Sequence, residues 1–122
     1  MKELVIPILN NEYKVIVCFG GAREVEKCMR LYKYPRVSWD ISEDLENMRG
    51  RTYYHPLCHP IILLPKKPKT AEDMGTLAHE SVHAIKHIFD KIEESSIDEV
   101  FAHSVGAVVR GVMDYKSLKE KK

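Results

Sequence analysis

Apolar runs near the N-terminus predict two β-strands. The runs Leu4–Leu9 and Tyr13–Phe19 are rich in β-branched residues, and the pair Asn10-Asn11 between them is a turn signal. Gly20-Gly21 then ends the pattern. We therefore expect two adjacent strands, or a β-hairpin, at the start of the chain.

A helical periodicity follows this pair of strands. From Ala22 to about Lys33, apolar residues recur every three or four positions, which is typical of a helix with one buried face that ends before Pro35. The acidic stretch that leads to Gly50 has no such periodicity. For this stretch we expect a solvated loop or a short helix.

Two shorter apolar runs in the middle of the chain predict further strands, at Arg51–Tyr54 and Ile61–Leu64. Prolines at positions 56, 60 and 65 surround the second run. Proline cannot donate a hydrogen bond to a neighbouring strand. We therefore expect the second strand to be short or to lie at a sheet edge.

Two helix start signals occupy the C-terminal half. Thr70, with Asp73 three residues later, predicts a capped helix from about Ala71 to Phe89. A second signal at Ser95-Ser96 predicts a last helix over about 97–113. Strands followed by two long helices indicate an α+β fold. We expect one domain over residues 1–115, with helices packed on a small mixed or antiparallel sheet, and a basic tail over 116–122.

Composition and charge limit the classes of protein to which this chain can belong. A chain of 122 residues with 44% apolar residues fits one domain with an ordinary core. The net charge of +1 offers no general attraction to nucleic acid or to anionic membranes. A role as a nucleic-acid-binding accessory factor would rest only on the basic residues at 66–69 and in the tail.

Cysteine usage and hydropathy bear on the compartment. The three cysteines contain no CxxC pair, which argues against a disulfide framework and for a reducing environment. The N-terminal stretch lacks the pattern of a signal peptide, and no apolar run approaches the ~20 residues of a membrane span. We expect a cytoplasmic protein.

The candidate chemistry lies in HESVH, where His79, Glu80 and His83 form the pattern HExxH. Positions i and i+4 of a helix share one face about 6 Å apart along the axis, so two imidazoles can bind one zinc ion beside the glutamate. Zinc lowers the pKa of bound water toward about 7, and Glu80 would accept the proton as the water attacks a carbonyl. The alternative is an accidental match on a solvated helix face, but the motif falls inside a capped helix with an apolar stripe. That stripe is expected to comprise Met74, Leu77, Ala78, Val82, Ile85 and Phe89.

Other histidines are not expected to join this pair. The Cα atom of His87 would lie about 12 Å along the axis from that of His79, so one zinc ion cannot readily take all three helix histidines. The segment 55–59, HPLCH, contains ligand types, but prolines restrict its backbone and no matching ligand pair is evident. We favour an inert loop there, while Tyr53, Tyr54 and His55 stay open as contacts to substrate.

A third ligand must come from outside this helix. Glu99 falls at the start of the predicted last helix and shares a face with Ala102, His103 and Gly106. Small residues on that face would let the two helices approach closely, so that Glu99 completes a site of two His, one Glu and one water. Alternatively, Glu99 is a plain helix-start carboxylate. His103 is the second candidate ligand, or a donor to the tetrahedral intermediate.

HESVH followed by DEVFAHSVG resembles the HExxH-plus-Glu zinc peptidases, the gluzincins in the broad sense, and in particular the very small metallopeptidases of phages and prophages. The likeness covers about residues 51–110. The stretch EVFA at 99–102 is similar to a short stretch of the ImmA/IrrE-type peptidases, which cut phage or stress repressors. Where such proteins commonly carry a tyrosine after FA, this chain has His103.

The resemblance implies a zincin-like fold in which the strand at 61–64 lies along the cleft and can pair with an extended peptide. It also supports zinc as the cofactor, with His79, His83 and Glu99 as the ligands of the zinc ion, and Glu80 as the general base. We therefore expect a zinc metallopeptidase that hydrolyses protein or peptide substrates, with His103 as a further catalytic candidate. The alternative is a zincin-like module that binds a metal or a protein without turnover, because so small a chain leaves little material for a deep cleft.

Overall fold

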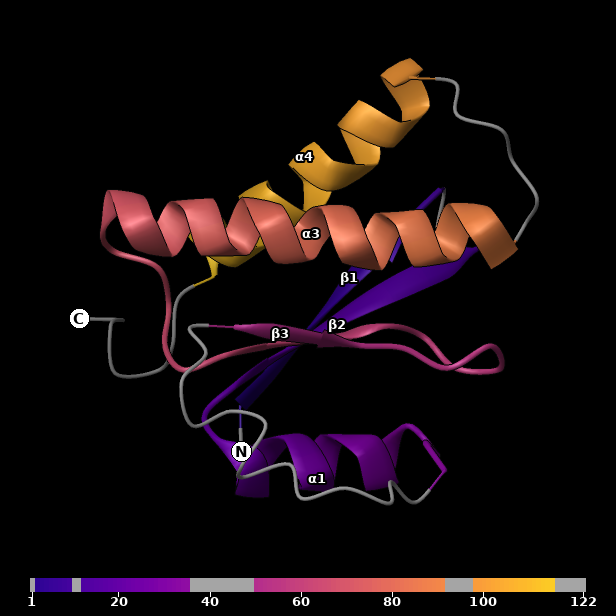
Figure 1. Ribbon diagram of the computed structural model, residues 1–122, viewed down its shortest axis with the longest axis vertical. Coiled ribbons are helices and arrows are strands. Elements are labelled where there is room, and N and C mark those ends of the chain that lie inside the picture. The colour runs from indigo at the N-terminus through magenta and orange to yellow at the C-terminus, as the bar shows by residue number, and fades with distance from the viewer. Residues whose placement is uncertain (1, 10–11, 36–49, 92–97, 116–122) are drawn as a thin grey trace.

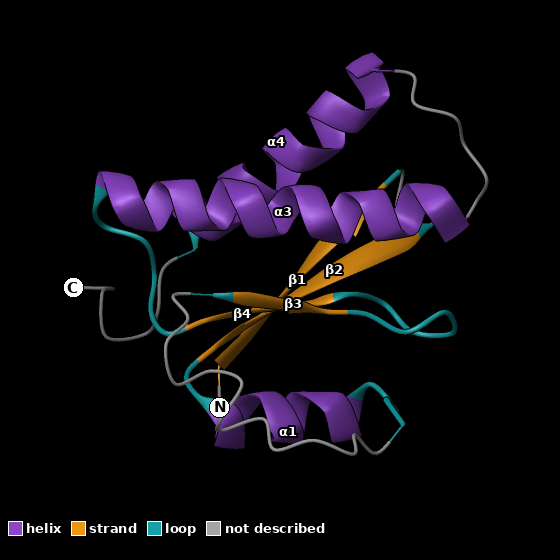
Figure 2. Ribbon diagram, in the orientation of Figure 1, coloured by secondary structure: helices purple, strands orange, loops and turns teal. Residues whose placement is uncertain are grey.

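The computed structural model describes residues 2–9, 12–35, 50–91 and 98–115. They form a four-stranded sheet with helices on both faces (Figures 1 and 2). The strand order is β1-β2-β4-β3, with a parallel pair in the centre and antiparallel pairs on either side, so the sheet is mixed. The α+β class and the small mixed sheet are confirmed.

The predicted N-terminal hairpin is present. β1 (Lys2–Ile8) runs antiparallel to β2 (Tyr13–Phe19), with Ile8 opposite Tyr13. Pro7 lies within β1, which is the first strand of the sheet order. A proline is tolerated there because an edge strand has one side on which no partner strand needs its N–H group.

Of the two alternatives expected for β4 (Ile61–Leu64), a short strand or an edge strand, the first holds. The strand is short, but it lies between β2 and β3 (Arg51–Tyr53), and all four of its residues are buried. Pro60 and Pro65 lie just outside the strand, so they end it without interrupting its hydrogen bonds to either neighbour. At this end of the described sheet the edge strand is β3, and the expectation that residues 61–64 pair with a peptide is wrong.

Helices cover both faces of this sheet. α3 (Ala71–Lys91) and α4 (Asp98–Asp114) lie on one face, and α1 (Ala22–Leu31) lies on the other, as Figure 1 shows. The side chains of β2 alternate accordingly. Val15 and Val17 join the core under α3 and α4, whereas Ile16 and Cys18 join the core over α1. The amphipathic pattern predicted α1, but it did not indicate that this helix takes the opposite face.

The start of α3 is capped as predicted. The backbone N–H of Asp73 donates to Thr70 Oγ1 at 3.1 Å, and the backbone N–H of Thr70 donates to Asp73 Oδ2 at 3.3 Å. These reciprocal bonds satisfy N–H groups that a helix terminus leaves without partners. The helix therefore begins at Ala71, and it extends two residues beyond the expected end at Phe89.

The buried stripe of α3 is rotated from the expected one. Leu77, Ile85 and Phe89 are buried as predicted, but Ala78 and Val82 are exposed. Ser81, Ala84 and Ile88 are buried instead, and they follow the 3.6-residue period from Leu77. This rotation turns Glu80 toward the sheet.

α4 (Asp98–Asp114) packs on α3 and β1. A Cβ atom placed at Gly111 would lie 2.8 Å from Ile6 Cδ1, so the absence of a side chain at this position permits the close approach of α4 to β1. The acidic stretch before Gly50, the start signal at Ser95-Ser96 and the basic tail lie outside the described residues. Within the described ranges, no helix combines the length and the apolar character needed to span a bilayer.

Candidate metal centre

Two imidazole rings converge on the exposed side of α3. The Nε2 atoms of His79 and His83 lie 3.2 Å apart, and the ring planes are 78° from each other. Two nitrogen ligands held about 2.0–2.1 Å from a tetrahedral zinc ion are separated by about 3.3 Å. The two side chains therefore have the chemistry and the spacing of a pair of ligands to one zinc ion.

Glu80 lies beside this pair but faces a different element. Its side chain is 8% exposed, and Oε1 accepts a hydrogen bond from the hydroxyl of Thr52 on β3 at 2.6 Å. The same hydroxyl oxygen lies 3.1 Å from the main-chain carbonyl oxygen of Glu80. A buried carboxylate requires such a partner, because burial without a hydrogen bond is costly. Glu80 is thus held between α3 and the edge of the sheet.

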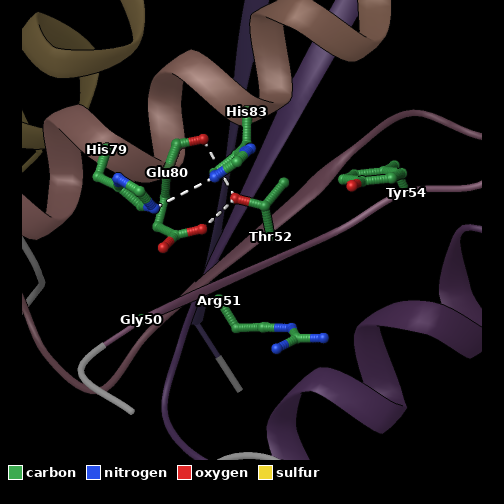
Figure 3. Close-up of a pocket in the computed structure, with 7 residues that line it drawn as sticks. All are labelled: Gly50, Arg51, Thr52, Tyr54, His79, Glu80 and His83. Atoms are coloured by element: carbon green, nitrogen blue, oxygen red, sulfur yellow. Dashed lines mark hydrogen bonds between the residues drawn. The ribbon is translucent and has the colours of Figure 1, made fainter.

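These residues line one cavity of about 310 Å³, which lies where β3 passes α3 (Figure 3). Figure 3 shows the imidazole rings and the Glu80 carboxylate lying together, whereas the Arg51 guanidinium points away from them. The volume is at the lower end of the range for small-molecule sites. The described residues that line the cavity are Gly50, Arg51, Thr52, Tyr54, His79, Glu80 and His83.

Gly50 allows the chain to enter β3 directly beneath the helix. A Cβ atom at this position would lie 2.8 Å from Thr76 Cγ2 and 3.3 Å from the carbonyl oxygen of Leu63. A real side chain would have to displace the Thr76 side chain and would press on the backbone of β4. The glycine therefore lets β3 come close enough to α3 for Thr52 to reach Glu80.

Glu99 is the predicted third ligand, and the described residues do not test this prediction. The residue is the second of α4, close to the predicted helix start, but its side chain lies outside the described part of the chain. Among the described side chains, no group of three or more His, Cys, Asp or Glu could hold one metal ion. Glu99 as a ligand remains a prediction.

His103 is not among the described residues that line the cavity. It lies on α4 with an exposed side chain. α4 contacts α3 through aromatic rings, with the ring centroids of Phe89 and Phe101 5.3 Å apart, whereas Ala102 on the face expected to meet α3 is exposed. A catalytic role for His103 is a prediction that the geometry of the cavity leaves untested.

His87 has a different environment from His79 and His83. It is half-buried, and its ring stacks on that of Tyr54, with centroids 5.0 Å apart and planes 21° from parallel. Tyr54 lines the cavity, whereas His87 does not. The structure thus gives His87 an aromatic contact beside the cavity.

The segment 55–59 makes contacts within its own turn. The backbone N–H of Leu57 donates to His55 Nδ1 at 3.1 Å, and Cys58 Sγ lies 3.7 Å from the same nitrogen. Of the three residues considered as substrate contacts, Tyr54 lines the cavity, His55 belongs to this turn, and Tyr53 is buried in the core over α1.

Thr52 is the residue of this site that sequence reasoning missed. Its position in a strand alternates with Arg51 and Tyr53, but a threonine in a short strand has no feature that indicates a partner 28 residues away. The contact depends on the crossing of β3 and α3, which the local sequence does not specify.

Comparison with known proteins does not assign a family. No family model, no curated protein and no solved structure matches this chain. The case for a function therefore depends on the geometry of the cavity and on the motif that forms it.

Proposed function

We propose that this chain is a zinc-dependent metallopeptidase with a zincin-like fold. The observation that carries the proposal is the 3.2 Å separation of the Nε2 atoms of His79 and His83 in the cavity that also contains the Glu80 carboxylate. These two histidines and Glu99 would hold the zinc ion. When bound, the ion would supply Lewis acidity, which makes a water molecule more acidic and polarises a carbonyl group.

Glu80 is the proposed general base. Its carboxylate lines the cavity beside the histidine pair, so it lies within reach of a water molecule placed there. Glu80 would accept the proton of this water as the water attacks the carbonyl carbon of the substrate. His103 is the proposed donor to the oxygen that develops negative charge, a role it would take from α4.

The position of β3 favours a peptide as the substrate. β3 is the last strand of the described sheet, and its residues Arg51 and Thr52 line the cavity. An extended peptide can add to the edge of a sheet through main-chain hydrogen bonds. A peptide lying along β3 would pass the histidine pair and Glu80, which suits hydrolysis of an internal bond.

A second candidate is a metal-binding or protein-interaction module without turnover. The small cavity and the length of β3, three residues, favour it, since they offer little surface to hold a substrate. The peptidase and the metal-binding module both require the histidine pair, but only the peptidase requires Glu80 as a base.

Peptide cleavage compared between the wild type and Glu80→Gln tests the proposal. Glutamine keeps the shape of Glu80 and can still accept the hydrogen bond from Thr52, but it cannot take the proton. We expect Glu80→Gln to bind zinc and to lose about 10²–10⁴-fold in kcat on a proteome-derived peptide library. Glu26→Gln, on the exposed side of α1, makes the same chemical change far from the cavity and should retain wild-type activity.

The outcomes separate the candidates. Cleavage that does not depend on Glu80 excludes the proposed mechanism. Protein purified without chelator that holds no stoichiometric zinc excludes the peptidase and the metal-binding form of the module, and leaves only the protein-interaction form. Zinc binding without any Glu80-dependent cleavage favours the module without turnover.

A further inference from the structure

The contact between Thr52 and Glu80 joins the edge strand to the helix of the histidine pair. Thr52 is 9% exposed and Glu80 is 8% exposed, so water competes little for this hydrogen bond. Figure 3 shows the Thr52 hydroxyl between the carboxylate and the main-chain carbonyl of Glu80, at 2.6 and 3.1 Å respectively. One side chain of β3 thus contacts Glu80 at two points.

The Thr52 hydroxyl donates its single proton in the hydrogen bond to the carboxylate of Glu80. A threonine has one O–H donor, and 2.6 Å is within the range of a charge-assisted O–H···O⁻ bond. The carbonyl oxygen of Glu80, in the middle of α3, is the usual acceptor for the N–H group four residues later. The contact to Oε1 is therefore the one that orients the side chain.

We propose that Thr52 is a positioning residue that fixes the orientation of the general base, an inference that rests on the proposed function. The last torsion of a glutamate side chain is broad, so a carboxylate without a partner samples many orientations. With Oε1 held by Thr52, the second oxygen, Oε2, is the one left to accept the proton of the attacking water. Thr52 thereby gives the two carboxylate oxygens different roles.

Thr52 lies on β3, the strand along which the substrate is proposed to bind, so the residue that orients Glu80 is part of the proposed binding strand. Tyr53 points into the core over α1, whereas Thr52 reaches Glu80 on the α3 side, as the alternation of a strand requires. A peptide added to β3 would therefore lie on the strand that orients the base. Displacement of β3 would move Thr52 and with it the carboxylate.

Three variants test the inference. Thr52→Val keeps the branched shape but removes the hydroxyl, Thr52→Ser keeps the hydroxyl, and Thr76→Val removes a hydroxyl one helical turn before Glu80 as a matched control. For Thr52→Val we expect a fall in kcat of about 10–100-fold, with KM changed less than about threefold, because misplacement of a catalytic group by about 1 Å has effects of this size. Thr52→Ser and Thr76→Val should stay within about threefold of wild type.

A second measurement does not depend on activity. In crystals or by ¹³C NMR of the zinc-free protein, the Glu80 carboxylate should be ordered in the wild type and in Thr52→Ser, and should adopt several orientations in Thr52→Val. Zinc affinity, measured by chelator competition, should be equal in all of these proteins, since the histidine pair is unchanged. A role in folding alone would instead lower zinc affinity and thermal stability together and leave kcat of the folded fraction intact.

The results distinguish failure of this inference from failure of the proposed function. If cleavage depends on Glu80 but Thr52→Val keeps wild-type kcat, the positioning role is overturned and the peptidase stands. If the Glu80 carboxylate keeps one orientation in Thr52→Val, the inference is overturned whatever the activity. Absence of any Glu80-dependent cleavage overturns the proposed function, and the inference that rests on it.

Discussion

Replacement of His83 by alanine should remove the response of the protein to zinc without weakening the zinc-free fold. His79 and His83 are both exposed, and their described contact is with each other. Surface substitutions of this kind usually change the free energy of unfolding by no more than about 0.5 kcal/mol. The zinc-free His83→Ala protein should therefore unfold within about 2 °C of the wild type.

The size of the zinc effect follows from ligand linkage. Free zinc at about 100 times its dissociation constant stabilises a folded protein by about 2.7 kcal/mol. For 122 residues, an unfolding entropy of about 2.1 cal/mol/K per residue gives about 0.26 kcal/mol per kelvin. Zinc should therefore raise the Tm of the wild type by about 10 °C, and loss of one of the two histidines should abolish most of this rise.

The assay is thermal unfolding followed by circular dichroism, with chelator and with buffered free zinc. His87→Ala is the matched control, because His87 lies on the same helix but stacks on Tyr54. It should lower the zinc-free Tm through loss of an aromatic contact of about 0.5–1.5 kcal/mol, and it should keep the full rise with zinc. The reasoning is refuted if His83→Ala retains the rise, or if His87→Ala loses it.

Two further predictions concern the fold. Gly75→Ala, at an exposed helix position with nothing within 4 Å of the added Cβ, should raise the free energy of unfolding by about 0.5–1 kcal/mol. Gly111→Ala should be about 1–3 kcal/mol less stable than Gly75→Ala, because its Cβ would meet the buried side chain of Ile6. Urea unfolding of the two variants checks this difference. The backbone N–H of Lys69, followed by that of the next residue, holds the pKa of Asp73 below 3.8. The ionised carboxylate therefore stabilises the fold above pH ~5, and this contribution is lost as the pH falls through the lower pKa of the folded state. Urea midpoints of wild type and Asp73→Asn should differ at pH 7 and converge toward pH 2, and a difference that is constant with pH would contradict the prediction.

Local signals predicted the parts of the fold that depend on neighbouring residues. The start of α3 was predictable because Thr70 and Asp73 bond to each other's backbone, and the spacing of HExxH then placed His79 and His83 one turn apart. The 3.2 Å separation of their Nε2 atoms follows from that spacing and from the rotamers of the two rings. These features need no knowledge of the sheet.

The strand order was not predictable from the prolines alone. Ile61–Leu64 is a continuous apolar run, and such runs are typical of strands that are buried on both faces. The prolines at both ends predicted a strand that is short or lies at an edge, and only the first alternative holds. Because the prolines lie outside the paired residues, the apolar pattern was the better guide.

The rotation of α3 and the role of Thr52 depend on contacts between distant segments. Val82 was expected in the core, but it is 42% exposed, because the sheet and α4 together bury the adjoining stripe that contains Ser81 and Ala84. Ser81 is accommodated because its hydroxyl donates to the carbonyl oxygen of Leu77 at 2.7 Å. A buried stripe that contains such a polar residue is not recognised when only apolar positions are counted.

The described residues that line the cavity lie between residues 50 and 83, either in or directly beside β3 or on α3. The tie between its two walls, from Thr52 to Glu80, spans 28 residues. The entropy lost in closing a loop rises only slowly with its length, so a contact at this separation costs little more than one across a shorter loop. The histidine pair, its neighbouring carboxylate and Thr52 thus form one unit within a contiguous stretch of the chain. Exchange of the segment that carries α4 would alter the proposed third ligand and leave this unit whole.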